Sequence, residues 1–137
     1  MKVAITGSTG AIATDLIARL ESDGHEVIRM VRGPVDSAAS VWAPADGWVR
    51  DGALEGCDAV VHLGGASIGE GRWTKKRKAE LHASRIDSTH LLIDHVKQLP
   101  NPPKVFVCAS AVGFYGDRGD EEVTESSSRG DGFLADL

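Results

Sequence analysis

The segment TGSTGAIA, residues 6–13, carries small residues at the spacing of a turn that binds a pyrophosphate. In such a turn Gly7 permits the tight bend, Gly10 lets the backbone approach the phosphates, and Ala13 allows a helix to pack closely on a strand where glycine is more usual. The N-terminus of the following helix offers N–H groups and a positive dipole end to the phosphates. These residues predict a dinucleotide site, although they would also suit a plain strand-to-helix turn.

The elements on either side of this turn favour a dinucleotide site. Residues 1–6 are a short apolar, β-branched run typical of a strand, and residues 15–24 have helical spacing that ends at Gly24. Residues 25–32 then predict a second strand. A glycine pattern that starts at a strand end and opens a helix inside a βαβ unit is far more specific than the same pattern alone.

The end of the second strand indicates which nucleotide would bind. An NAD site usually has an Asp or Glu there for the ribose 2′-hydroxyl, whereas an NADP site has an Arg for the extra phosphate. Here Arg32 lies at the exit of the strand, and Arg29 is its solvent-facing neighbour. After Arg32, the first carboxylate in the sequence is that of Asp36. We therefore expect NADP(H) to be favoured over NAD(H), with Arg32 as the phosphate contact. The alternative is that both arginines are ordinary surface residues.

The rest of the chain continues to alternate between strand and helix patterns. Residues 39–42 predict a short edge strand, residues 59–63 a covered parallel strand, and residues 104–109 a fifth strand. Between the last two, a long helix is expected over residues 74–97, with Thr74 as its N-cap. This alternation predicts an α/β fold, a Rossmann-type doubly wound parallel sheet in the order 3-2-1-4-5.

The final residues, FLADL at 133–137, resemble the first turn of another helix. A doubly wound dinucleotide fold normally continues with a sixth strand and a substrate-binding portion. We therefore expect residues 1–137 to be one NAD(P)-binding Rossmann domain, the N-terminal part of a larger fold.

Composition favours a soluble cytoplasmic domain with one core. The chain has 137 residues, 42% of them hydrophobic, and a net charge of −5, which argues against nucleic acid as the main partner. We expect neither a signal peptide nor a membrane span. Cys57 and Cys108 fall beside or within the expected strands, which predicts reduced, packed thiols. The acidic residues between 117 and 125 lack the spacing of a metal-binding loop, so no metal site is expected.

Four separated motifs, TGSTGAIA, DAVVHLGG, SRIDSTHLL and SAVGFYG, resemble the extended short-chain dehydrogenase/reductase family. EGRWTKKRKAEL and FYGDRGDEEVTE are similar in particular to its atypical branch of NAD-dependent epimerases/dehydratases, or nucleoside-diphosphate-sugar epimerases. In that family, loops at the carboxyl edge of the sheet converge on the cofactor. The resemblance implies a set of cofactor-binding residues. They are Gly7, Ser8, Thr9, Gly10, Ala11 and Ile12 at the pyrophosphate, Leu63, Gly64 and Gly65 at the adenosine and ribose, and Ala109 and Ser110 near the nicotinamide.

The catalytic pattern of the family is incomplete in this sequence. Extended members use a Ser or Thr after the fifth strand and the Tyr and Lys of a YxxxK motif. Ser110 is the candidate catalytic hydroxyl, displaced by one position, and Tyr115 matches the structural tyrosine of the YG motif. The expected place of the catalytic tyrosine holds apolar residues near 133–137, and Arg85 replaces an asparagine common in the preceding helix.

Three other features have a plain structural explanation. His62, at the end of a buried strand, is expected to be a hydrogen-bonded core residue more than a cofactor contact. The cations at 75–78 would spread around a solvated helix. Trp73 suits either a substrate pocket or packing against the long helix.

Two hypotheses of different kinds remain. The first is an NADP(H)-dependent oxidoreductase or epimerase-like enzyme that acts on a small polar substrate such as a nucleotide sugar, with Ser110 orienting a substrate hydroxyl. The second is a non-catalytic NADP(H)-binding sensor or scaffold, which the missing tyrosine favours.

Overall fold

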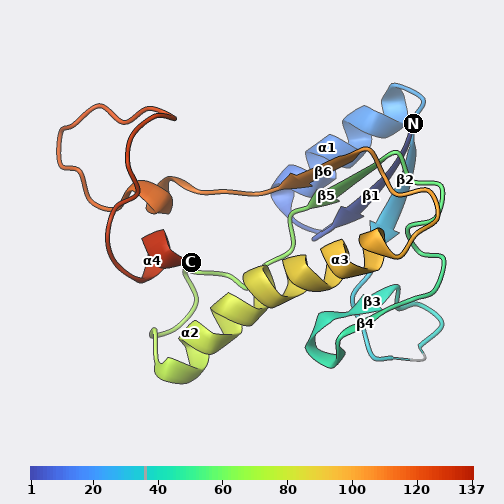
Figure 1. Ribbon diagram of the computed structural model, residues 1–137, viewed down its shortest axis with the longest axis horizontal. Helices are drawn as coiled ribbons and strands as arrows, with labels where there is room; N and C mark the ends of the chain where they lie inside the picture. The colour runs from blue at the N-terminus through green and yellow to red at the C-terminus, as the bar shows by residue number, and fades with distance from the viewer. Residues whose placement is uncertain (36) are drawn as a thin grey trace.

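Four parallel strands form the sheet, in the order β2-β1-β5-β6 (Figure 1). They are β1 (Lys2–Thr6), β2 (Glu26–Met30), β5 (Ala59–His62) and β6 (Val105–Cys108). The computed structural model describes residues 1–35 and 37–137, so Asp36 lies outside the described residues. The central strands are apolar runs of about the expected lengths, and the parallel α/β fold is as the sequence predicts.

Helices cover both faces of the sheet (Figure 1). On one face, α1 (Ala11–Ser22) packs Ala13 and Ile17 against Val3 and Ile5 of β1. On the other face, the alternate residue of β1, Ala4, belongs to a second cluster that includes Leu92 of α3 (Ser88–Lys97). Because side chains of a strand alternate between faces, an apolar run with no polar interruption is what a doubly covered strand requires.

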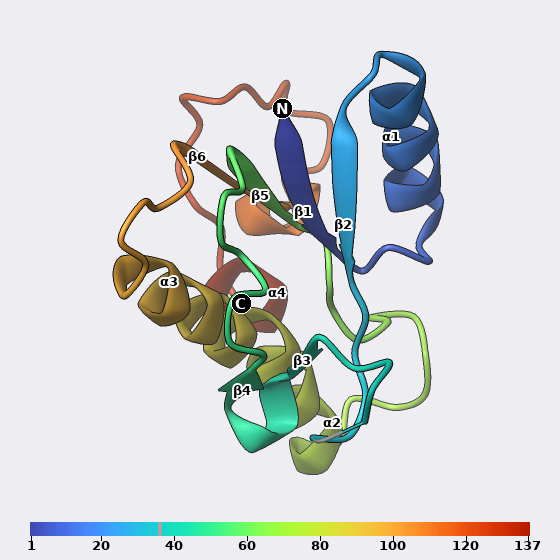
Figure 2. The same ribbon diagram turned by 90° about the vertical axis from the view of Figure 1, so that its right-hand side faces the viewer.

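The expected third strand at 39–42 is not a member of this sheet, and that prediction is wrong. Instead β3 (Trp42–Ala43) and β4 (Trp48–Val49) form a separate antiparallel pair, which lies against α3 (Figure 2). One isolated bridge between Arg32 and Trp42 joins this ribbon to the end of β2. The chain turns immediately after β3 at Pro44, which has no N–H to donate to a neighbouring strand, so the pairing with β2 does not extend beyond this bridge.

The helix expected over 74–97 is one helical run with a change of pitch in its middle. α2 (Lys75–His82) continues into a π-helical turn, η2 (Ala83–Asp87), and then into α3. Thr74 is the N-cap, and its side chain accepts a hydrogen bond from the Arg77 N–H at 3.2 Å. Isolated π-helical turns inside α-helices are frequently found at functional sites.

The edge strand β6 is more exposed than the sequence predicts. Val105 and Val107 are 51% and 46% exposed, and Cys108 is exposed as well, so the prediction that Cys108 is a packed thiol is wrong. Cys57 is buried as expected. Among the described residues, the apolar cluster between α1 and the sheet includes side chains of β1, β2 and β5 and none of β6, so Val105 and Val107 stay uncovered on that face.

After β6 the chain forms a short 3₁₀ turn, η3 (Val112–Tyr115), an irregular loop, and α4 (Phe133–Asp136), which agrees with the helical start expected at the final residues (Figure 1). Phe133 packs edge-on against Trp73, with ring centroids 5.6 Å apart. Among the helices of the described residues, none has the length and apolar character that crossing a membrane requires.

Candidate functional site

The glycine turn connects β1 to α1 in a conformation that requires glycine at its first position. Gly7 has φ of 64°, and its carbonyl accepts a hydrogen bond from the Gly10 N–H at 2.9 Å. A Cβ on Gly7 would lie 2.7 Å from the Leu63 carbonyl oxygen, so the turn touches the end of β5. Among the described residues, no side chain caps the first turn of α1. Its N–H groups are therefore available to a phosphate, which is what a dinucleotide needs at this place.

A cavity of about 390 Å³ extends from this turn to the end of β2; we call it the cofactor cleft. Eight of the residues expected to bind the cofactor line it: Gly7, Ser8, Thr9, Gly10, Arg32, Leu63, Gly64 and Gly65. The cleft lies where β1 separates β2 from β5, the point at which dinucleotides bind in doubly wound sheets. Ala11 and Ile12 are not among its lining residues, and Ile12 is 75% exposed.

The two arginines of the second strand have different surroundings. Arg32 is exposed and lines the cofactor cleft beside Trp42, whose indole N–H donates to the Met30 carbonyl at 3.0 Å. Arg29 lies 3.3 Å from the Glu21 carboxylate in an exposed ion pair. Arg32 is therefore the one placed to meet a group bound in the cleft, and Arg29 is its solvent-facing neighbour.

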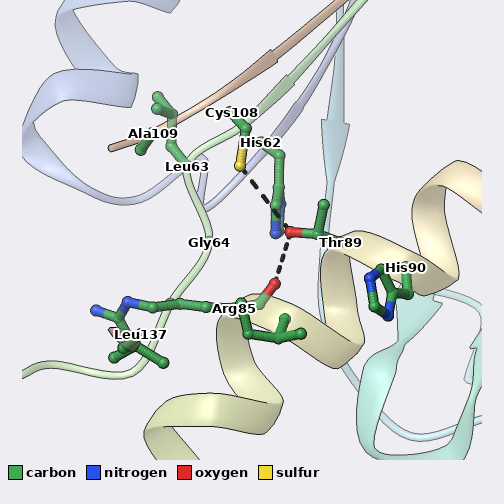
Figure 3. A pocket seen from close by; sticks show the side chains of 11 residues that line it. His62, Leu63, Gly64, Arg85, Thr89, His90, Cys108, Ala109 and Leu137 are labelled. Carbon is green, nitrogen blue, oxygen red and sulfur yellow. Dashed lines mark hydrogen bonds between the residues drawn. The ribbon is translucent and has the colours of Figure 1, made fainter. Parts of the chain in front are cut away.

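A second cavity, of about 340 Å³, opens between the ends of β5 and β6 and the helical run; we call it the β6 cavity (Figure 3). It shares Leu63, Gly64 and Gly65 with the cofactor cleft, and its other lining residues are His62, Arg85, Ile86, Thr89, His90, Cys108, Ala109 and Leu137. A dinucleotide that lies across the switch point with its adenosine end near β2 directs its other end toward this side of the sheet.

A chain of buried hydrogen bonds joins the two cavities. The Thr6 hydroxyl oxygen accepts from the N–H groups of Leu63 at 3.1 Å and Gly64 at 3.0 Å, which occupies both lone pairs. Its hydrogen must then be donated to His62 Nδ1, 2.6 Å away. His62 Nε2 consequently carries the ring proton and donates to the Ser88 hydroxyl at 3.2 Å.

The far end of this chain fixes the same tautomer. The Ser88 hydroxyl donates to the Ser84 carbonyl at 2.8 Å, so its oxygen is an acceptor for His62. Burial lowers the pKa of His62, and a protonated ring would bring two hydrogens to face each other between His62 and Thr6. His62 is therefore a neutral, hydrogen-bonded core residue, as expected, and it also lines the β6 cavity.

The π-helical turn carries Arg85 to the wall of the β6 cavity (Figure 3). Its guanidinium donates to the Ala66 carbonyl at 3.0 Å and lies against the backbone of Gly65, where a Cβ would be 3.2 Å from the Arg85 Cζ. A Cβ at position 65 would therefore require the guanidinium to shift by a few tenths of an ångström. Burial, and to a smaller extent the charge of Arg77, lower the pKa of Arg85.

The candidate catalytic residues do not all line the same cavity. Ala109 lines the β6 cavity, whereas Ser110, the next residue, is exposed and is not among the lining residues of either cavity. Tyr115 lies in η3 against the ring of Phe114, with centroids 5.1 Å apart. Leu137 reaches the β6 cavity from the segment where the family pattern places its tyrosine.

Residues that sequence reasoning did not single out complete the site. Thr6, Ser84 and Ser88 form the hydrogen-bonded chain, and Trp42 closes one side of the cofactor cleft. The spacing of Ser84 and Ser88, four residues apart in a helical pattern, could have indicated one polar helix face.

The resemblance noted in the sequence is shown by comparison with known proteins. The NAD-dependent epimerase/dehydratase family matches residues 3–131. An epimerase family protein of Mycobacterium leprae is 40% identical over 136 residues, which cover 98% of this chain and 44% of that protein. The human epimerase family protein SDR39U1 is 35% identical over 133 residues, covering 96% of this chain and 44% of that protein. The chain thus spans less than half the length of these relatives.

Solved structures give the same result. The human SDR39U1 structure with NADPH superimposes with a TM-score of 0.82 at 31% identity, covering 99% of this chain and 45% of that one. A nucleoside-diphosphate sugar epimerase from Corynebacterium glutamicum has a TM-score of 0.79 at 39% identity, covering 99% of this chain and 28% of that one. With its parallel sheet, glycine turn and cofactor cleft, this chain belongs to the NAD-dependent epimerase/dehydratase family.

Proposed function

We propose that this chain is the NADP(H)-binding part of an oxidoreductase or epimerase-like enzyme that acts on a small polar substrate such as a nucleotide sugar. The observation that carries the proposal is that Arg32 lines the same cleft as Gly7 and Gly10. A cation at the end of the second strand that shares a cleft with a phosphate-binding turn suits a 2′-phosphate. The NADPH named with the human relative supports the same choice.

Each part of the cleft has a role in this proposal. The first turn of α1 holds the pyrophosphate, and Gly7 keeps the turn close to β5. Leu63, Gly64 and Gly65 are assigned to the adenosine and ribose side. Outside the cleft, Ala109 in the wall of the β6 cavity and the exposed Ser110 that follows it are assigned to the nicotinamide end. When bound, the cofactor supplies hydride transfer. The Ser110 hydroxyl orients a hydroxyl group of the substrate.

Calorimetric titration of the full-length protein with NADPH and NADH in parallel tests the nucleotide assignment. We expect at least a tenfold preference for NADPH, about 1.4 kcal/mol. The variant Arg32→Gln should lose that preference and leave NADH binding unchanged. Arg29→Gln is the matched control, because Arg29 is paired with Glu21, and it should keep the preference. Equal binding of both nucleotides by the unmodified protein would refute the role of Arg32.

A non-catalytic NADP(H)-binding sensor or scaffold is the second candidate. It is favoured because, among the described residues, no tyrosine lines the β6 cavity and Ser110 is exposed outside it. Nicotinamide absorbance across a panel of nucleotide sugars and other small polar substrates separates the two functions. Turnover that Ser110→Ala abolishes, with NADPH affinity unchanged, supports the enzyme; no turnover across the panel supports the sensor.

A further inference from the structure

Arg85 presents a partly buried positive charge to the β6 cavity. Its Nη2 donates to the Ala66 carbonyl at 3.0 Å, and its Nη1 makes longer contacts with the Leu81 carbonyl at 3.4 Å and the Ser84 hydroxyl at 3.3 Å. A guanidinium has five N–H donors. The Nε–H has no partner among the described residues, so the group can donate further bonds to a ligand.

This charge has no counter-ion in the described part of the chain. The neighbouring Arg77 is paired, because its Nη1 lies 2.8 Å from the Glu80 carboxylate. No ion pair includes Arg85, and its oxygen partners are neutral carbonyl and hydroxyl groups. A charge withdrawn from water without a counter-ion is costly, and an anion placed beside it recovers that cost.

The rest of the cavity wall does not oppose an anion. Its side chains are apolar, hydroxyl, thiol or imidazole groups, and no Asp or Glu side chain is among them. Hydrogen bonds from both Nη atoms to Ala66, Ser84 and Leu81 hold the guanidinium beside Gly65. A fixed planar fork suits two-point recognition of a carboxylate or phosphate better than a flexible ammonium does.

We propose that Arg85 binds an oxyanion of the substrate, a carboxylate or a phosphate group, inside the β6 cavity. This inference rests on the proposed function, because it places the anionic group on the part of the substrate that lies beside the cofactor. It makes Arg85 a specificity-determining residue, and it excludes uncharged polyols and simple alcohols as good substrates.

The experiment measures oxyanion binding to the full-length protein with its phosphate-binding cleft already filled. Inorganic phosphate and succinate are titrated into protein saturated with NADPH, with succinamide as the uncharged probe, and binding is followed by the fluorescence of the bound nucleotide and by calorimetry. The same titrations are run without NADPH. Inorganic phosphate tests recognition of a phosphate group, and succinate tests recognition of a carboxylate.

Three variants accompany the unmodified protein. Arg85→Gln removes the charge, Arg85→Lys keeps the charge but not the fork, and Lys76→Gln removes an exposed charge from the same helical run, away from the cavity. We expect at least one oxyanion to bind saturably, at least tenfold more weakly to Arg85→Gln, at an intermediate level to Arg85→Lys, and unchanged to Lys76→Gln. Circular dichroism and urea unfolding report that the variants fold, and NADPH affinity should stay within twofold in Lys76→Gln, whose side chain lines neither cavity.

The outcomes distinguish this inference from the proposed function. NADPH binding together with oxyanion binding that is equal in Arg85→Gln and the unmodified protein overturns the inference alone. Succinamide binding as tightly as succinate does the same. If Arg85→Gln fails to fold, unchanged oxyanion affinity in Arg85→Lys is the overturning result. The protein could also bind neither nucleotide and still bind an oxyanion in a way that depends on Arg85. That result supports the inference about the cavity and refutes the proposed function.

Discussion

Replacing Thr6 with valine tests the hydrogen-bonded chain that holds the ends of β1 and β5 together. Valine has nearly the shape of threonine but neither accepts nor donates a hydrogen bond. The side chain is 0% exposed, so water cannot replace the lost hydroxyl without rearrangement. Thr6→Val therefore leaves His62 Nδ1 and the N–H groups of Leu63 and Gly64 without their partner.

The size of the effect follows from the burial of these three groups. Leaving a buried donor or acceptor unsatisfied costs about 1–3 kcal/mol. His62 is 2% exposed and bears the full cost, whereas Leu63 and Gly64 are half-buried and belong at the low end of the range. We expect the free energy of unfolding to fall by about 3–5 kcal/mol. Because Leu63 and Gly64 line both cavities, NADPH affinity should fall as well.

Urea unfolding followed by circular dichroism measures the change, provided that the slope of the transition is the same in both proteins. Thr14→Val is the matched control, because the Thr14 hydroxyl donates at 2.9 Å to the Gly10 carbonyl on an exposed helix turn. That variant should lose no more than about 0.5 kcal/mol. A loss in Thr6→Val as small as in the control would refute the assignment of donors and acceptors from Thr6 to His62.

Three further outcomes are expected. Gly7→Ala should lower the free energy of unfolding by about 2–5 kcal/mol, because φ is 64° and the new Cβ meets the Leu63 carbonyl at 2.7 Å; denaturant titration checks this. Burial lowers the pKa of His62 from 6.5 in the folded protein. As the pH falls below about 6.5, the unfolded chain therefore binds a proton first, and the free energy of unfolding falls until the folded form is protonated too. His62→Gln should flatten that part of a plot of the free energy of unfolding against pH. Native protein treated with a maleimide should be modified at exposed Cys108 and not at Cys57, whose thiol pKa is raised by burial, as peptide mass spectrometry would show.

The parts of the fold that the sequence predicts correctly are those with local causes. β1 and β5 are contiguous apolar runs, and Thr74 caps its helix through a bond to a residue three positions away. The failure at residues 39–42 also has a physical reason. Trp42 forms one bridge to Arg32 and donates its indole N–H to the Met30 carbonyl, and these tertiary contacts outweigh a weak strand pattern.

In the candidate site, too, the parts with local causes follow from the sequence, and the contacts between distant residues do not. The glycine turn is one continuous segment, so its geometry follows from its own residues. The bond from Thr6 to His62 joins positions 56 residues apart, and the bond from His62 to Ser88 joins positions 26 apart. No spacing rule connects such residues; their meeting depends on which strands are neighbours and on the pitch of the π-helical turn.

The three shared residues, Leu63, Gly64 and Gly65, give the two cavities a common wall. Thr6 holds this segment from the side of the sheet, and Arg85 lies against it from the side of the helices. We expect a ligand that shifts this segment in one cavity to displace Arg85 or the glycine turn in the other. Such linkage is reciprocal, so any factor by which the cofactor strengthens oxyanion binding is also the factor by which an oxyanion strengthens cofactor binding. The π-helical turn fits this role, because it places Ser84, Ser88 and Arg85 so that one helical run contacts both cavities.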